Sequence, residues 1–191
     1  MTLHTADKPK ALRVSLRRLG MDDADRIRRW MLDPDLVRFT VLVPGPEYAV
    51  EGVANPDAAE HYIDQLLRDP RRLSFAILLD GVHVGNVGLK DYEHGVPEAE
   101  CFIEIGERRL RGRGIGQEAM KLLLEHCFFR LGLRAVRLGV FDFNESAIRL
   151  YRRLGFRHTG RYGWHWCNGG YHEVLGMRLE RSFYTGEDDG D

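Results

Sequence analysis

The stretch RGRGIGQEAM, residues 111–120, places three glycines at alternate positions directly in front of a helix-like run. Glycine costs conformational entropy, so a cluster of glycines usually marks backbone that must come close to something. The first turn of a helix has unpaired N–H groups and the positive end of the helix dipole, and both favour an anion. The stretch therefore predicts a phosphate-binding loop. The alternative is a glycine-rich turn before an ordinary helix.

Two familiar phosphate loops do not fit this stretch. The dinucleotide-binding fingerprint needs a third glycine where Gln117 stands, and the nucleoside-triphosphate loop needs a G-K-S or G-K-T ending that is absent here. The remaining pattern is R-x-x-G-x-G, formed by Arg111, Gly114 and Gly116, with Gly112 as an additional glycine. This pattern alone does not decide between a phosphate loop and a turn.

Length and charge limit the possible classes of protein. A chain of 191 residues is long enough for one domain with a substantial core and short for two. The formal net charge is −1, so the chain has no overall basic field for nucleic acid or an anionic membrane. We therefore expect neither a nucleic-acid partner nor a membrane partner.

Cysteine spacing and hydropathy indicate a cytoplasmic protein. Cys101, Cys127 and Cys167 lie far apart, and no pair has metal or redox spacing, so we expect free thiols and no metal. The first ten residues lack the apolar segment of a secretory signal, and the longest apolar run, residues 75–79, is too short to span a bilayer.

The order of predicted elements indicates an α/β fold with a largely antiparallel sheet. Asp80 and Gly81 form a tight turn between two apolar runs, which predicts a hairpin. The helix after the glycine loop is expected to bury a stripe made of Ile115, Ala119, Leu122, Leu123 and Phe129. The predicted strands are 14–17, 73–79, 82–91, 99–106, 134–141, 157–167 and 171–181, and the predicted helices are 22–32, 57–68, 114–130 and 144–154.

The stretch NESAIRLYRRLGF, residues 144–156, adds a second motif about thirty residues after the glycine loop. Together the two motifs resemble the GNAT superfamily of acetyltransferases. Within it, the opening residues 14–19 and the tail around Tyr171 and Met177 are similar to the RimJ/RimL-type protein acetyltransferases and the spermidine acetyltransferases. The resemblance covers residues 11–183 and implies a single domain. That domain would be a mixed, mostly antiparallel seven-stranded sheet flanked by helices on both faces, with flexible tails at 1–10 and 184–191.

The resemblance implies acetyl-CoA as the acetyl donor and gives the glycines a role. Backbone amides of residues 111–116 would wrap the coenzyme pyrophosphate, because a Cβ would hold the phosphates away from the N–H groups. The strand before the loop would separate from the next parallel strand and offer backbone groups to the pantetheine arm and the thioester carbonyl. The implied coenzyme-binding residues are Ile103, Glu104, Ile105, Arg111, Gly112, Arg113, Gly114, Ile115, Gly116, Asn144 and Tyr151.

Acetyl transfer to an amine requires a base for the amine and an acid for the departing thiolate. Tyr151 matches the general acid of the family, and the alternative for it is a core tyrosine. Glu100 and Glu104 share one face of a strand with Phe102, and carboxylates on an otherwise apolar strand are candidates for the base. We rank Glu100 ahead of Glu104. Either carboxylate can instead be structural, in which case the base acts through water or comes from elsewhere.

The function that these motifs predict is transfer of acetyl from acetyl-CoA to a primary amine by direct attack in a ternary complex. The acceptor can be a protein N-terminus, a polyamine or another small amine, and residues 33–56, the helix that follows them and the last hairpin are expected to select it. Trp164 and Trp166 in that hairpin form either an aromatic wall for the acceptor or an apolar sheet face. The alternative function is a non-catalytic module that senses acetyl-CoA. A homodimer is expected at the level of the family.

Overall fold

The computed structural model describes residues 13–33, 36, 39, 56–167 and 170–185. Most of the predicted loop at 33–56, the predicted tail at 1–10 and the end of the other tail lie outside these residues. The side chains of Trp164 and Trp166 also lie outside the description.

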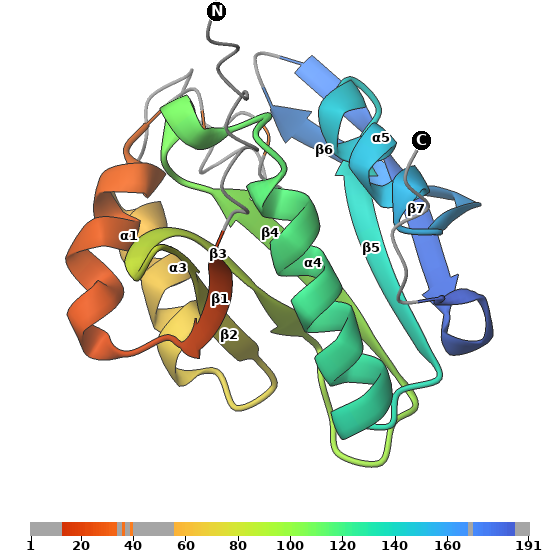
Figure 1. Ribbon diagram of the computed structural model, residues 1–191. Helices are drawn as coiled ribbons and strands as arrows, with labels where there is room; N and C mark the ends of the chain where they lie inside the picture. Colours follow the sequence, from red (N-terminus) through yellow and green to blue (C-terminus); the bar gives the residue numbers. More distant parts are fainter. Residues whose placement is uncertain (1–12, 34–35, 37–38, 40–55, 168–169, 186–191) are drawn as a thin grey trace, which may run out of the picture.

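The described strands form one seven-stranded sheet in the order β1-β2-β3-β4-β5-β7-β6 (Figure 1). Neighbouring strands are antiparallel except β4 and β5, which are parallel and are joined through a helix. The predicted fold class is therefore confirmed. The strands are β1 (Val14–Arg18), β2 (Leu73–Leu79), β3 (Val82–Lys90), β4 (Glu98–Ile105), β5 (Ala135–Phe141), β6 (Arg157–Cys167) and β7 (Gly170–Glu180).

Helices cover both faces of the sheet (Figure 1). On one face, α1 (Ala24–Met31) and α3 (Pro56–Arg68) pack together and contact Phe102 of β4. On the other face, α4 (Ile115–Glu125) and α5 (Glu145–Arg153) pack on apolar residues of β3, β4 and β5. No helix in the described part of the chain is long and apolar enough to cross a membrane.

The buried side of α4 differs from the predicted stripe. Burial follows i, i+4 steps from Ile115 through Ala119 and Leu123 to Cys127, and Phe128 beside it is fully buried. Phe129 lies two residues beyond Cys127, roughly half a turn away, and its side chain is 60% exposed. The prediction that Phe129 belongs to the core was wrong.

The parallel strands β4 and β5 separate towards their C-terminal ends. Their pairing covers only Glu98–Glu100 of β4 against Ala135–Arg137 of β5. Beyond that point β4 continues to pair with β3 on its other side, as far as Ile105 opposite Gly85. The predicted separation is confirmed, and it leaves a space between the two strands in the middle of the sheet.

Candidate active site

A cleft of about 760 Å³ occupies the space between the separated strands. Its walls come from β4, β5, the glycine loop, α5 and the side of α3 that faces the sheet. The cleft therefore connects the two faces of the sheet at the place where β4 and β5 are not paired. The residues that line the cleft include Tyr62, Arg72, Lys90, Glu100, Cys101, Phe102, Ile103, Glu104, Ile105, Arg111, Gly112, Gly114, Gly116, Asn144, Ser146, Ala147 and Tyr151.

The glycine loop forms one end of the cleft and requires glycine for its conformation. Gly112 has φ +73° and Gly114, the residue that caps α4, has φ +82°. Side chains with a Cβ disfavour this left-handed region. The first N–H groups of α4 have no intrahelical partner, and they lie at a wall of the cleft lined by Gly114 and Gly116. This arrangement suits a phosphate group.

The other residues of the predicted loop divide into two groups. Arg111 lines the cleft, but its guanidinium donates from Nε to the carbonyl of Ile105 (2.9 Å) and from Nη2 to the carbonyl of Gly106 (3.5 Å). The Arg111 side chain therefore ties the loop to the end of β4. Arg113 and Ile115 do not line the cleft, and the Ile115 side chain is buried in the core against the sheet.

Alternate residues of β4 point to opposite faces of the sheet, as a strand requires. Cys101, Ile103 and Ile105 belong to the apolar cluster under α4 and α5. Phe102 packs under α1 and α3, and Glu104 on the same side contacts α3. The two predicted glutamates therefore lie on the α3 side, whereas Tyr151 belongs to the α5 side.

Glu104 is a buried carboxylate with two hydrogen-bond donors. Only 6% of the residue is exposed, and its Oε1 accepts from Asn86 Nδ2 (2.6 Å) while Oε2 accepts from the Tyr62 hydroxyl (3.1 Å). Burial raises the pKa of Glu104 from 4.5 to about 7, against the opposing effects of these donors and of Arg111 and Arg72. A carboxylate with this pKa both ionises and accepts protons near neutral pH, as a general base must.

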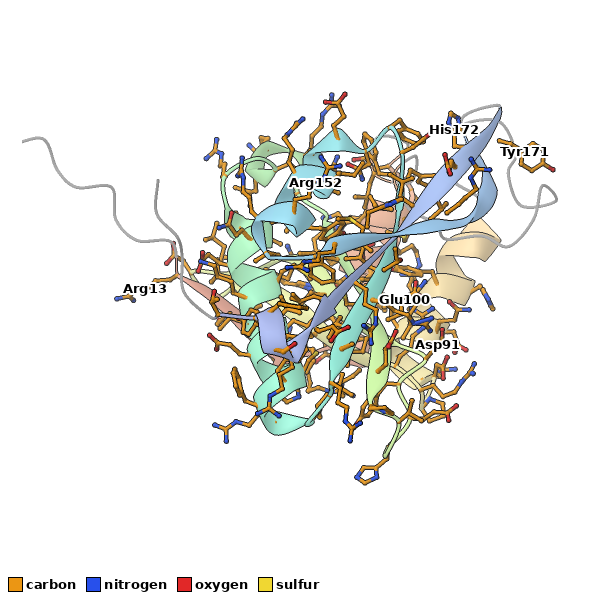
Figure 2. All side chains as sticks on the ribbon, turned by 90° about the vertical axis from the view of Figure 1, so that its right-hand side faces the viewer. Arg13, Asp91, Glu100, Arg152, Tyr171 and His172 are labelled. Carbon is orange, nitrogen blue, oxygen red and sulfur yellow. The ribbon has the colours of Figure 1, made fainter. Side chains whose placement is uncertain are left out.

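Glu100 has a different environment, although it is also buried. Its Oε1 lies 2.6 Å from Lys90 Nζ, and its Oε2 lies 3.9 Å from Arg137 Nη2. Figure 2 labels Glu100 over the strands, and only 3% of the residue is exposed. The Glu100 carboxylate is therefore engaged by two cations, which is the arrangement of a structural ion pair.

Tyr151 projects from α5 into the cleft and packs its ring against Phe156, with ring centroids 5.7 Å apart. The residue is 7% exposed, and burial raises the pKa of its hydroxyl, so the phenol keeps its proton at neutral pH. Among the described residues, no side chain or backbone group hydrogen-bonds to this hydroxyl. Tyr151 therefore presents a protonated phenol at the wall of the cleft, and its role as the acid stays a prediction.

Asn144, the first residue of the predicted helix 144–154, caps α5. Its Oδ1 accepts a hydrogen bond from the backbone N–H of Ala147 (3.3 Å) and another from the Ser146 hydroxyl (3.1 Å). Asn144 also lines the cleft, so contact with the coenzyme arm stays a prediction. No group of His, Cys, Asp and Glu side chains in the described ranges is arranged to hold a metal ion.

An anion-binding loop that leads into a gap between separated parallel strands is the arrangement implied above for an acyl-CoA-dependent transferase. A family model described as "Acetyltransferase (GNAT) domain" matches residues 13–157. The chain therefore belongs to the GNAT acetyltransferase family, and it is an acetyl-CoA-dependent N-acetyltransferase.

Relatives in this family act on different amines. The chain is similar to the spermidine N(1)-acetyltransferase of Escherichia coli strain K12, at 27% identity over 94% of this chain and 92% of the relative. It is also similar to the L-amino acid N-acetyltransferase AaaT of the same strain, at 24% identity over 77% and 85%. The fold matches a spermidine N-acetyltransferase from Vibrio cholerae, crystallised with CoA and spermine, with a TM-score of 0.74 and 22% identity over 90% and 97% of the two chains.

Sequence reasoning did not identify Tyr62 and Asn86, the two donors to Glu104. Asn86 stands in the middle of an apolar strand, which is the same signal that singled out Glu104. Tyr62 gives no such signal, because an aromatic residue on the apolar face of a helix normally belongs to the core.

Proposed function

We propose that this enzyme acetylates a primary amine by direct attack, with Glu104 as the base and Tyr151 as the acid. The observation that carries the proposal is that both residues line one cleft, although they belong to opposite faces of the sheet. The gap between β4 and β5 is where a group bound on one face meets a group bound on the other.

The chemistry divides between the two faces. Acetyl-CoA supplies a thioester whose C–S bond breaks during transfer. On the α3 side, Glu104 accepts a proton from the acceptor ammonium, so that the nitrogen has a free electron pair for the carbonyl carbon. On the α5 side, the Tyr151 hydroxyl donates its proton to the departing sulfur, and the second proton that the nitrogen loses as the amide forms returns to the Tyr151 oxygen through water. The first-turn amides of α4 bind the phosphates and fix the position of the thioester.

Glu104, and not the higher-ranked Glu100, is the base in this proposal. The Glu100 carboxylate is already paired with Lys90 and close to Arg137, so it is held in contacts that a base would have to break. Glu104 has neutral donors, and burial keeps its pKa near 7. Both glutamates are buried, and the difference is that Glu100 forms ion pairs whereas Glu104 accepts hydrogen bonds from neutral donors.

The acceptor that we propose is a small primary amine, with polyamines first. Support comes from the spermidine acetyltransferase relative, which matches this chain over nearly its whole length. The amino acid acetyltransferase relative supports amino acids as the second group to examine.

A thiol-release assay with acetyl-CoA tests the proposal against spermidine, spermine, free amino acids and a short peptide with a free N-terminus. We expect CoA release that depends on one of these amines and an acetylated product of the expected mass. Calorimetry on the same protein serves as the control for coenzyme binding. Tight binding of acetyl-CoA without turnover of any amine would instead support the acetyl-CoA sensor.

A further inference from the structure

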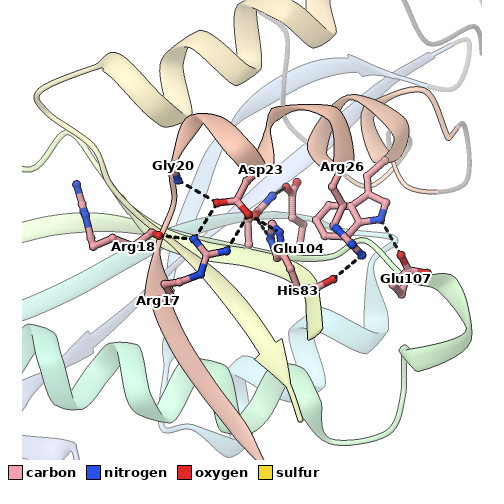
Figure 3. Close-up of polar contacts among 10 residues, drawn as sticks. Arg17, Arg18, Gly20, Asp23, Arg26, His83, Glu104 and Glu107 are labelled. Atoms are coloured by element: carbon pink, nitrogen blue, oxygen red, sulfur yellow. Dashed lines mark hydrogen bonds and ion pairs between the residues drawn. The ribbon is translucent and has the colours of Figure 1, made fainter. Parts of the chain in front are cut away.

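A line of buried polar side chains continues from Glu104 away from the cleft (Figure 3). Asn86, which donates to Glu104, has its Oδ1 2.9 Å from His83 Nε2. His83 Nδ1 lies 3.1 Å from Oδ1 of Asp23, and Asp23 accepts two hydrogen bonds from Arg17 (2.8 and 3.1 Å). Asp23 and His83 are each 6% exposed, and Asn86 is fully buried. Polar groups buried to this degree are costly unless they are paired, so the line is a built feature of the fold.

The Asn86 amide can face Glu104 with its N–H group or with its oxygen, and this orientation affects the charge of Glu104. An ionised carboxylate only accepts hydrogen bonds, so Asn86 must turn its N–H group towards Glu104 and its oxygen towards His83. His83 Nε2 must then carry a proton in order to donate to that oxygen. If the amide were reversed, its oxygen would face the carboxylate, and only a protonated Glu104 could make that contact.

Asp23 and His83 set this direction together. With its proton on Nε2, a neutral His83 would face the Asp23 carboxylate with a bare Nδ1, and the Nδ1 contact is in fact poorly aligned for a hydrogen bond. Asp23 acts to raise the pKa of His83, but burial has the larger effect and, with Arg26, lowers this pKa overall. In either charge state of the ring, the alignment favours a proton on Nε2, because Nε2 faces the Asn86 oxygen and Nδ1 has no aligned hydrogen-bond partner.

We propose that Asp23, His83 and Asn86 form a positioning chain, which fixes the Asn86 amide so that it donates to Glu104 and keeps that carboxylate available as the base. The proposal rests on the proposed role of Glu104. None of the three residues lines the cleft, so each acts through Glu104 and not on the acceptor.

Other groups also face the two titrating residues. Glu104 meets the Tyr62 hydroxyl from α3, Arg111 from the glycine loop and Arg72 from the segment before β2. His83 meets the edge of the Trp30 ring at 4.9 Å between centroids, and its carbonyl accepts from Arg26 Nη1 (3.1 Å). All of these groups are unchanged in the variants below, so a change in pH dependence can be assigned to the chain itself.

The pH dependence of kcat/KM tests the proposal. Asn86→Leu removes the donor and keeps a side chain of similar size. Loss of a hydrogen bond to a charged group should raise the pH at which kcat/KM falls off on the acid side of its profile, the acid limb, by about one to two pH units. His83→Phe keeps a ring beside Trp30 but removes the Nε2 donor, so we expect a shift in the same direction. His83→Gln has an amide N–H that can replace that donor, and the limb should return towards the wild-type position. Cys127→Ala is the control for a buried change elsewhere.

A purely structural role would lower the amplitude of all these profiles without moving the acid limb, and that result would overturn the proposal. A second measurement does not depend on turnover. NMR of the wild-type protein with labelled histidine should show a proton on His83 Nε2 at neutral pH, and the labelled Glu104 carboxyl should titrate at higher pH in Asn86→Leu. A bare Nε2, or an unchanged Glu104 titration, would refute the chain even if no amine were turned over. Absence of turnover together with the expected NMR result would refute only the proposed function.

Discussion

Replacement of Glu104 by glutamine tests the proposed base, because the change keeps the shape of the side chain and removes its ability to accept a proton. A primary ammonium has a pKa of about 10.4, so proton transfer to an ordinary carboxylate is uphill by about 8 kcal/mol. Transfer to Glu104, whose pKa burial raises to about 7, is uphill by about 5 kcal/mol. Burial of Glu104 therefore removes about 3 kcal/mol from the cost of this step.

The size of the expected loss follows from the same values. Without a base the enzyme can use only amine molecules that are already uncharged. At pH 7 only about one amine molecule in 2,500 is uncharged. We expect kcat/KM of Glu104→Gln to fall by roughly 10³-fold at pH 7, within the range of general base catalysis. The loss should diminish about tenfold per pH unit towards pH 10, whereas the wild-type profile should rise through pH 7 and then level off.

The assay is thiol release with saturating acetyl-CoA and limiting amine, measured from pH 5.5 to 10. Glu100→Gln is the matched control, since it makes the same chemical change on the same strand. It should keep the acid limb near pH 7, although loss of its ion pair with Lys90 can lower stability. The proposed base is wrong if Glu104→Gln keeps the wild-type profile, or if Glu100→Gln is the variant that loses the limb.

Three further predictions concern the acid, the glycine loop and the stability of the fold. Tyr151→Phe should lower kcat and kcat/KM together by about 10²–10⁴-fold with little change in acetyl-CoA affinity, and Tyr184→Phe, which also loses a hydroxyl, should not. Gly114→Val should weaken acetyl-CoA binding in calorimetry, whereas Gly95→Val should not, because Gly95 has a similar φ of +88° in a turn outside the cleft. Since the folded protein keeps the Glu104 proton between pH 4.5 and 7 and the unfolded chain loses it, stability should fall as pH rises through this window. Thermal melts should therefore show that the Tm of Glu104→Gln relative to that of wild type is higher at pH 8 than at pH 4.5.

The sheet was predictable because its signals are local. Asp80 and Gly81 both have positive φ in the structure, 48° and 82°, as the turn residues of a tight hairpin do. Gly155, which directly follows the predicted helix 144–154, has φ +90°. The error at Phe129 arose because two adjacent aromatic residues near a helix end fit the apolar side almost equally well, and the turn at His126–Arg130 is π-helical.

The choice between the two glutamates needed information that is not local. Both lie on the same face of β4, so the period of the strand cannot separate them. The register with β3 separates them, because it places Lys90 opposite Glu100 and Asn86 opposite Glu104. Cross-strand neighbours determine the environment of a side chain on a sheet, and here one neighbour is a cation and the other a neutral donor.

Burial and hydrogen bonding must both act on Glu104 for it to serve as the base. Burial alone would raise its pKa further and leave it protonated at neutral pH, unable to accept a proton. Donors alone would hold the pKa low, and transfer from the ammonium would then be steeply uphill. The structure combines nearly complete burial with donors from Asn86 and Tyr62, and these opposing effects leave the pKa at about 7. Removal of the Tyr62 hydroxyl should therefore move the acid limb upwards, in the same direction as loss of the Asn86 amide.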